Sequence, residues 1–204
     1  MISEQRSTAA PARVRDPERK SKILGAAADL VARNGFHAVS MADIGGAAGI
    51  TGSGIYRHFP SKSAVLVALF DHAIDELLRD EEQIVEAVGE LGGMLDQLIA
   101  GQVEFVVAQR ELAQVYHNEI HNLPAADQRR LRRKQRLYVE EWVHVLDELR
   151  TDLTDSDARA LVHAAIGAIQ STLFHNSGLP GGRLRELLTA AARAVLGLPG
   201  HVSR

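Results

Sequence analysis

The chain lacks several residue types, and each absence excludes a class of structure or chemistry. None of its 204 residues is cysteine, so disulfides, thiolate metal sites and thiol redox sensing are excluded. Aromatic residues make up only 4%, and no segment shows the alternating Val, Ile, Thr and aromatic residues of a strand. Ala and Leu dominate instead, which favours helix. The sequence therefore predicts an all-α protein.

Long apolar runs are also missing. The longest near the middle of the chain, residues 64–70, is seven residues and far too short to span a membrane. Residues 1–15 contain three arginines but no continuous apolar stretch, so a secretory signal is not expected. We expect a cytoplasmic protein without a membrane partner.

Patterns typical of enzymes do not stand out either. No nucleophile–base pair, phosphate loop or complete set of metal ligands occurs at a recognisable spacing. The glycine-rich patches at residues 45–54 and 178–182 do not follow a strand, so a nucleotide-binding loop is not expected. The interpretation is a protein that is not an enzyme and has no cofactor.

The charge is distributed unevenly along the chain. The whole chain has a formal net charge of −3. Residues 1–62 carry nine Lys and Arg against five Asp and Glu, a net charge of +4, whereas the remainder carries 14 against 21, a net charge of −7. A basic N-terminal part on an acidic body indicates a polyanion-binding surface near the N-terminus.

The N-terminal part has the signals of three helices. Asp16 and Pro17 open the first, which ends at Asn34 and Gly35. Residues 40–43 form a capping box that opens a second helix. Thr51 caps a third, running to about residue 59. Two short helices separated by a turn of about three residues are the helix-turn-helix arrangement.

The chain beyond residue 62 has the pattern of further helices with few breaks, at residues 122–124 and 176–182 among others. About nine helices are expected in all. The predicted organisation is a flexible arm over residues 1–15, a helix-turn-helix DNA-binding domain over 16–62, and a larger helical ligand-binding and dimerisation domain over 63–204.

Residues 40–62, SMADIGGAAGITGSGIYRHFPSK, closely resemble the DNA-binding segment of the TetR family of bacterial repressors. The matching elements follow in the family's order: Ser40, Asp43 and Ile44, residues 48–51, residues 55–59, and Ser61 and Lys62. With the first helix and the start of the fourth, the resemblance covers roughly residues 16–75. So many elements in order make the signal specific.

The resemblance implies that the outer face of residues 51–58 enters the major groove. We expect Tyr56 and His58 to donate to phosphate oxygens, Lys62 to add a cationic phosphate anchor, and Arg57 to contact guanine or phosphate in a bidentate manner. The expected DNA-binding set is Ser40, Thr51, Gly52, Ser53, Gly54, Tyr56, Arg57, His58 and Lys62.

The sequence departs from the family pattern at four glycines. Gly45 replaces the usual alanine and is followed by Gly46, so the second helix should be less stable by about 1 kcal/mol per glycine. Gly52 and Gly54 leave the third helix with few long side chains, so Ser53, Arg57 and close backbone approach would carry much of the base reading.

The resemblance also implies dimerisation through the last two long helices, here about residues 156–175 and 182–196, with ordinary packing within one chain as the alternative. A two-fold dimer would bind a palindromic operator, and a ligand that changes the separation of its two heads would release it. The expected dimer residues are Leu161, Ala165, Gly167, Ala168, Leu184, Leu188 and Ala191.

A ligand pocket is expected among the middle helices, with mostly apolar walls suited to a lipid-like or aromatic molecule. Its expected lining is Leu98, Gln102, Phe105, Val106, Tyr116, His117, His121, Tyr138, Trp142, Gln170 and Phe174. Some lipid-metabolism repressors of the family sense acyl-CoA, and residues 138–146 resemble theirs.

A basic run over residues 128–136 bears on the same question. Arg129, Arg132, Arg133 and Arg136 are candidates to hold the phosphates of an acyl-CoA at the pocket mouth. The alternative is a solvated helix face whose cations pair with acids such as Asp127 and Glu140.

Two further alternatives stay open. His117 and His121 lie one helical turn apart with Glu119 between them, which would suit a metal-sensing regulator, although a pair of histidines is more often polar lining. Asn118 stands where a zinc protease needs glutamate, so a hydrolase is not expected. The second alternative is a helical interaction module that does not bind DNA.

Overall fold

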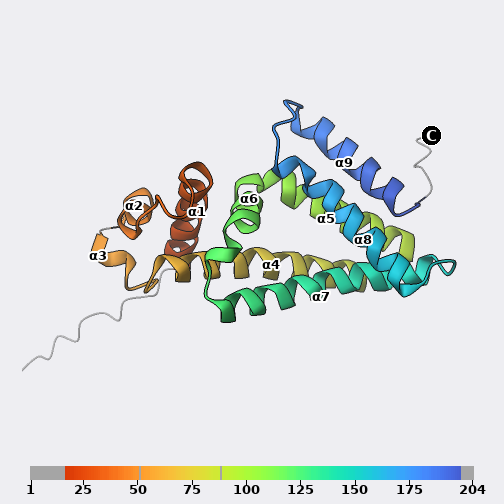
Figure 1. Ribbon diagram of the computed structural model, residues 1–204, viewed down its shortest axis with the longest axis horizontal. Coiled ribbons are helices and arrows are strands. Elements are labelled where there is room, and N and C mark those ends of the chain that lie inside the picture. The colour runs from red at the N-terminus through yellow and green to blue at the C-terminus, as the bar shows by residue number, and fades with distance from the viewer. Residues whose placement is uncertain (1–16, 51, 88, 199–204) are drawn as a thin grey trace, which may run out of the picture.

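The computed structural model describes residues 17–50, 52–87 and 89–198, in which helices joined by turns and loops are the regular structure and no strand occurs (Figure 1). The all-α prediction is therefore confirmed, while the arm and Thr51 lie outside the described residues. The helices are α1 Pro17–Asn34, α2 Met41–Ala47, α3 Gly52–Ile55, α4 Lys62–Ala87, α5 Leu91–Ala108, α6 Arg110–Glu119, α7 Ala125–Leu149, α8 Asp155–Gln170 and α9 Gly181–Val195, with 3₁₀ turns η1 Ile120–Asn122 and η2 Ser171–Leu173.

Local sequence signals set several of the helix ends. The Ser40 hydroxyl accepts from the Asp43 N–H at 3.1 Å, and the Asp43 carboxylate accepts from the Ser40 N–H at 2.8 Å. This is the predicted capping box at the start of α2. Gly35 and Gly49 have φ of 77° and 68°, the left-handed conformation that ends α1 and permits the turn before α3.

The buried apolar side chains form two clusters. The first joins α1, α2 and α3 to the first half of α4, and also includes Val115 of α6, Ile120 of η1, Leu123 just after η1, and Leu131 of α7. The second joins α5, α7, α8 and α9. Helix α4 runs from one cluster to the other with α7 alongside it (Figure 1).

The first cluster does not end at residue 62, where the sequence analysis places the domain boundary. Val65, Leu66, Leu69 and Phe70 of α4 are at most 3% exposed within it. The short helices α2 and α3 bury too little apolar surface alone, so they depend on the helices packed against them. We call residues 17–74 the head and the second cluster with its helices the body.

Helix α5 is long and apolar enough to cross a membrane by length and composition alone. In the fold it packs against α4, α7, α8 and α9, and Leu95, Leu98 and Ile99 are at most 1% exposed. Its apolar character is that of a core helix in the body.

Candidate nucleic-acid interface and effector domain

The third helix is shorter than the sequence predicts. It comprises residues 52–55, and the N–H groups of His58 and Phe59 then both donate to the Ile55 carbonyl, at 2.9 and 3.0 Å. This tight turn replaces the helix expected to continue to residue 59. Ile55 and Phe59 are 0% and 5% exposed, so the segment is anchored from inside. Tyr56 and Arg57 lie on its exposed side, and Tyr56 is 57% exposed.

Gly45 brings α2 and the turn before α3 close together. It is buried, and its carbonyl oxygen accepts from the Ile50 N–H at 2.8 Å. A Cβ at this position would lie 3.2 Å from the Ile50 carbonyl oxygen and 3.7 Å from the Ile55 Cβ. The glycine that the sequence analysis treats only as a loss of helix stability therefore permits a close backbone approach.

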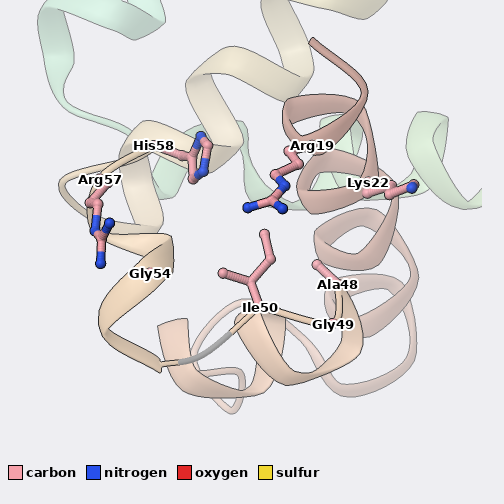
Figure 2. A pocket seen from close by; sticks show the side chains of 8 residues that line it. All are labelled: Arg19, Lys22, Ala48, Gly49, Ile50, Gly54, Arg57 and His58. Atoms are coloured by element: carbon pink, nitrogen blue, oxygen red, sulfur yellow. The ribbon is translucent and has the colours of Figure 1, made fainter. Parts of the chain in front are cut away.

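A basic hollow of about 450 Å³ lies between α1 and α3 (Figure 2). The guanidinium of Arg19 extends from α1 over Ile50, and Arg57 and His58 stand across from it on the segment after α3 (Figure 2). Cationic side chains from α1 and from the turn after α3 around one opening suit a phosphate of the DNA backbone. The hollow is lined by Arg19, Lys22, Ala48, Gly49, Ile50, Gly54, Arg57 and His58.

The predicted contact residues divide around this hollow. Gly54, Arg57 and His58 line it, and Ser53 is exposed beside it. Ser40 is exposed with its hydroxyl engaged in the capping box, and Gly52 begins α3. Sequence reasoning did not assign Arg19 and Lys22 as contacts, although their spacing of three residues in the first turns of α1 places them near one face.

Lys62 has a different role from the predicted phosphate anchor. Its ammonium donates to the carbonyl oxygens of Phe36 at 2.5 Å and Val39 at 2.6 Å, reaches that of His37 at 3.5 Å, and lies 4.3 Å from the centre of the Phe36 ring. An ammonium has three N–H donors, and these three oxygens take them. Lys62 therefore holds the loop between α1 and α2, and the expectation of a phosphate anchor is corrected.

The same loop is bound from the other side by the end of α6. The Phe36 N–H donates to Glu119 Oε1 at 3.2 Å, and Asn122 Nδ2 donates to Glu119 Oε2 at 2.6 Å. The His37 Nε2 lies 3.1 Å from Asn122 Oδ1. The loop that orients α2 is thus fixed by α4 on one side and by α6 and η1 on the other.

An exposed, basic helix-turn-helix surface on an all-helical chain defines the class as DNA-binding regulators rather than enzymes. Two family models match the chain: bacterial regulatory proteins of the tetR family over residues 23–69, and the tetracyclin repressor-like C-terminal domain over residues 94–174. The chain belongs to the TetR family. The predicted family is thereby confirmed.

Two curated relatives are similar in sequence. The transcriptional repressor KstR2 of Rhodococcus jostii is 29% identical over 107 residues, and this match covers 52% of this chain and 52% of that protein, about half of each. The fatty acid metabolism regulator protein of Bacillus subtilis is 23% identical over 159 residues, covering 74% of this chain and 80% of that protein.

Solved structures have the same fold. A TetR-family regulator from Bordetella parapertussis aligns with a TM-score of 0.80 at 23% identity, over 93% of this chain and 98% of that one. AibR, in complex with isovaleryl coenzyme A and operator DNA, aligns with a TM-score of 0.72 at 16% identity, over 84% of this chain and 96% of that one.

The predicted pocket residues do not surround one space. Leu98, Gln102, Val106, Tyr138 and Trp142 are buried in the body, at most 6% exposed. Phe105 and Gln170 are half-buried in the body.

The remaining predicted lining residues lie elsewhere. Tyr116 packs its ring against Phe70 of the head, with centroids 4.9 Å apart. His117 and Phe174 are exposed and contact each other, with ring centroids 4.7 Å apart, and His121 is exposed. These four residues are therefore not part of a common interior lining, which corrects that part of the prediction.

The interior of the body holds polar groups that the sequence analysis did not single out. Glu81 is 6% exposed, and its Oε1 has no hydrogen-bond partner among the described residues. Burial raises the pKa of Glu81 to about 8, and the nearby charge of Glu141 adds to this rise. Burial likewise raises the pKa of Tyr138.

The basic run of α7 has two faces. Arg130 donates to both carboxylate oxygens of Asp71, at 2.5 and 2.7 Å, and Lys134 bridges Asp71 at 2.9 Å and Asp75 at 2.6 Å. These two cations bind α7 to α4. Such pairing with acidic residues is what the alternative of a solvated helix face predicts, although the acids are Asp71 and Asp75 of α4. The other four, Arg129, Arg132, Arg133 and Arg136, are exposed.

The metal-sensing alternative gains no further ligands from the fold. Within residues 17–50, 52–87 and 89–198, no group of three or more His, Asp or Glu side chains is placed to hold a metal ion. His117 instead contacts the Phe174 ring.

The predicted dimer residues differ in how far they are buried within the single chain. Ala165 and Leu188 are 0% and 6% exposed in the body's own core, so they are corrected to intrachain packing residues. Gly167 and Ala191 are exposed, and the other three are half-buried: Leu161, Ala168 and Leu184.

Proposed function

We propose that this protein is a cytoplasmic, sequence-specific transcriptional repressor that binds a palindromic operator as a dimer and is released by a small hydrophobic effector. The observation that carries the proposal is the basic hollow between α1 and α3, bordered by the exposed segment of Tyr56 and Arg57. A hollow of this charge on a helix-turn-helix suits a DNA phosphate next to the major groove.

The residues of the head have different proposed roles in DNA binding. Arg57 is the long cationic side chain next to the short third helix, so it is the proposed bidentate contact to guanine or phosphate. Arg19, Lys22 and His58 would hold a phosphate and so fix the register of the head on the duplex. Lys62 contributes indirectly, because it fixes the loop that orients α2.

The experiment is a gel-shift titration of the full chain against its own promoter DNA over a series of salt concentrations. We expect a specific shift whose log affinity falls linearly with log salt, because bound cations release phosphate counterions. An affinity for promoter DNA equal to that for scrambled DNA of the same length would contradict the proposal.

The proposed dimer uses the outer faces of α8 and α9. Ala160, Ala164 and Gly167 are exposed at intervals of four and three residues along α8, and Ala191 and the 41% exposed Leu187 lie outward on α9. Small side chains on one face let two helices approach closely. Light scattering should give twice the 22.2 kDa chain mass at micromolar concentration, and a single-chain mass would contradict this part.

The proposed effector is an acyl-CoA. The similar structure of AibR holds isovaleryl coenzyme A, and a curated relative is a fatty acid metabolism regulator. The four exposed arginines of α7 are available to the phosphates of such a molecule. Long-chain acyl-CoA titrated into the protein–promoter complex should release the DNA, with free CoA as the control, and retention at saturating acyl-CoA would reject this effector.

A further inference from the structure

A second hollow lies where the head meets the start of α6. It has a volume of about 300 Å³ and is lined by residues of α1, α4 and the first turn of α6. Helix α1 packs against both of the other helices (Figure 1). A volume of this size is at the lower end of the range for small-molecule sites. We call it the junction hollow.

The inner wall of the junction hollow is apolar. Leu69 of α4 and Ala28 of α1 line it and are 3% and 8% exposed, while Leu24 and Leu112 line it and are half-buried. All four belong to the core of the head or pack against it. A molecule in the hollow would therefore remove apolar surface from water, which favours binding.

The fixed charges around the junction hollow are of one sign. Asp29 of α1 and Glu111 of α6 line it, together with the exposed His72 of α4, and no Lys or Arg is among its described lining residues. The basic hollow between α1 and α3 has the opposite lining, with three Lys and Arg side chains and no carboxylate. The two hollows of the head therefore suit ligands of opposite charge.

Both carboxylates are available to a ligand. Asp29 pairs with Arg33 at 3.8 Å, but both side chains are mostly exposed, so this pair is weak. Glu111 is exposed and forms no ion pair or side-chain hydrogen bond with another described residue. It lies in the first turn of α6, where a negative charge interacts favourably with the helix dipole. A cation at the rim could therefore reach two acceptors.

Gly25 keeps the hollow open on the side of α1. It lies inside an 18-residue helix, where glycine is less favourable than alanine. No described atom lies within 4 Å of the position that its Cβ would take, so close packing does not require this glycine. Because Gly25 lines the hollow, a larger side chain here would occupy part of the space.

We propose that the junction hollow binds a small organic cation, a protonated amine attached to a compact apolar group. The apolar group lies against Leu69 and Leu112, and the ammonium donates to Asp29 and Glu111 at the rim. Such a molecule contacts the head and the first turn of α6 at once, whereas the last turn of α6 holds the α1–α2 loop through Glu119. The inference goes beyond the proposed function, because the hollow is neither the DNA-facing one nor part of the body's interior.

Three probes of matched size test the charge preference. Cyclohexylmethylamine, cyclohexylmethanol and sodium cyclohexanecarboxylate are titrated into the full chain by isothermal titration calorimetry at fixed salt. We expect the amine to bind about tenfold more tightly than the alcohol, from two exposed ion pairs of about threefold each. The carboxylate should bind most weakly, because it meets two like charges.

Charge variants test whether the two carboxylates are responsible. Glu111→Gln and Asp29→Asn should each weaken the amine by about threefold and leave the alcohol unchanged. Glu82→Gln removes one exposed carboxylate of α4 that does not line the hollow. It should leave the affinity for the amine unchanged, and a loss equal to that of Glu111→Gln would show attraction to overall charge only.

A filling variant tests the location. Gly25→Leu should weaken both the amine and the alcohol by at least about tenfold, because its side chain would take the place of their apolar group. Gly46→Leu is the matched control, since Gly46 is also an exposed helix glycine with no atom within 4 Å of a Cβ, but it lies outside the hollow. It should leave both affinities unchanged.

Equal affinities for the amine and the alcohol, tighter binding of the carboxylate, or an amine affinity unchanged by Gly25→Leu would each overturn the inference. If Gly25→Leu fails to fold, as judged by circular dichroism, Glu111→Gln and the order of the probes decide. Promoter binding is measured on the same preparations by gel shift. Protein that shifts its promoter without binding the amine overturns this inference alone, whereas protein that binds the amine without shifting its promoter contradicts the proposed function alone.

Discussion

In the head, charged groups lie on the surface around an apolar core, whereas the body carries polar groups within its core. The described residues that are both polar and buried are Glu81, Gln102 and Thr172, all beyond the head. The cations Arg19 and Arg57 instead border an open hollow. A protein that binds a polyanion outside and a small molecule inside needs this division, because each ligand requires polar partners where it sits.

The largest expected effect is on promoter affinity, after substitution of an exposed cation of the head. Arg57→Ala should weaken promoter binding by roughly 5- to 150-fold, as expected for the loss of about 1–3 kcal/mol at a bidentate contact. If Arg57 contacts phosphate, the slope of log affinity against log salt concentration should also fall in magnitude by about 1. Gel shifts over a salt series measure both quantities.

The control for Arg57 removes the same charge elsewhere on the head. Arg33 lies in the last turn of α1 and pairs only loosely with Asp29 at 3.8 Å on the surface. Arg33→Ala should change affinity by less than about threefold. Equal losses from both variants would mean that general charge, and not the hollow, governs binding.

The second prediction compares Lys62, whose ammonium binds loop carbonyls inside the head, with Lys22, which lines the hollow. Lys62→Met should lower the free energy of unfolding by about 1–3 kcal/mol, since it leaves part-buried carbonyl groups unpaired. The slope of its log affinity against log salt should stay unchanged, because carbonyl oxygens of the loop between α1 and α2 already take the N–H donors of Lys62. Lys22→Met should do the opposite, with normal urea unfolding and a shallower slope. A shallower slope in Lys62→Met would restore it as a phosphate contact.

The third prediction uses the buried carboxyl of the body. Because the pKa of Glu81 is raised from 4.5 to about 8, the folded state holds this proton more firmly than the unfolded state does. Its contribution to stability is therefore greatest at low pH and is lost as pH rises from about 4.5 to 8.

Glu81→Gln removes this dependence. Relative to the natural chain, the variant should gain about 1–3 kcal/mol of unfolding free energy between pH 6 and pH 9. Urea unfolding followed by Trp142 fluorescence measures the difference at each pH. A difference between the two proteins that does not vary with pH would show that Glu81 is already ionised at pH 6.

The smallest effects concern two adjacent glycines of the head. Gly46 has no atom within 4 Å of a would-be Cβ, so Gly46→Ala should raise stability by about 0.5–1 kcal/mol. Gly45→Ala should gain nothing, because its Cβ would crowd the Ile50 carbonyl oxygen at 3.2 Å. Thermal unfolding compares the pair, and an equal gain at both positions would refute the close approach of α2 and the turn.

What the sequence predicts well depends on neighbours along the chain. The capping box at Ser40, the turn glycines Gly35 and Gly49 and the apolar spacing of α1 all act within a few residues, so the helix-turn-helix could be located before any fold was known.

What it predicts poorly depends on contacts far apart in sequence. Lys62 binds carbonyls 23–26 residues earlier in the chain, and no local pattern reveals this. Glu81 stands between the acids Asp80 and Glu82, where it looks like part of a solvated helix face, yet it points into the body. The predicted pocket failed in part because Tyr116 packs against the head instead.

The sharing of α4 between two cores bears on how such proteins are recombined. A chimaera cut at residue 62 would separate Ile23, Ile44 and Ile55 from the α4 side chains that cover them, and would also discard the α6 and α7 residues of the same cluster. Exchange of operator specificity between relatives is therefore more readily achieved by grafting the few outward side chains near α3 than by transplanting a whole N-terminal module.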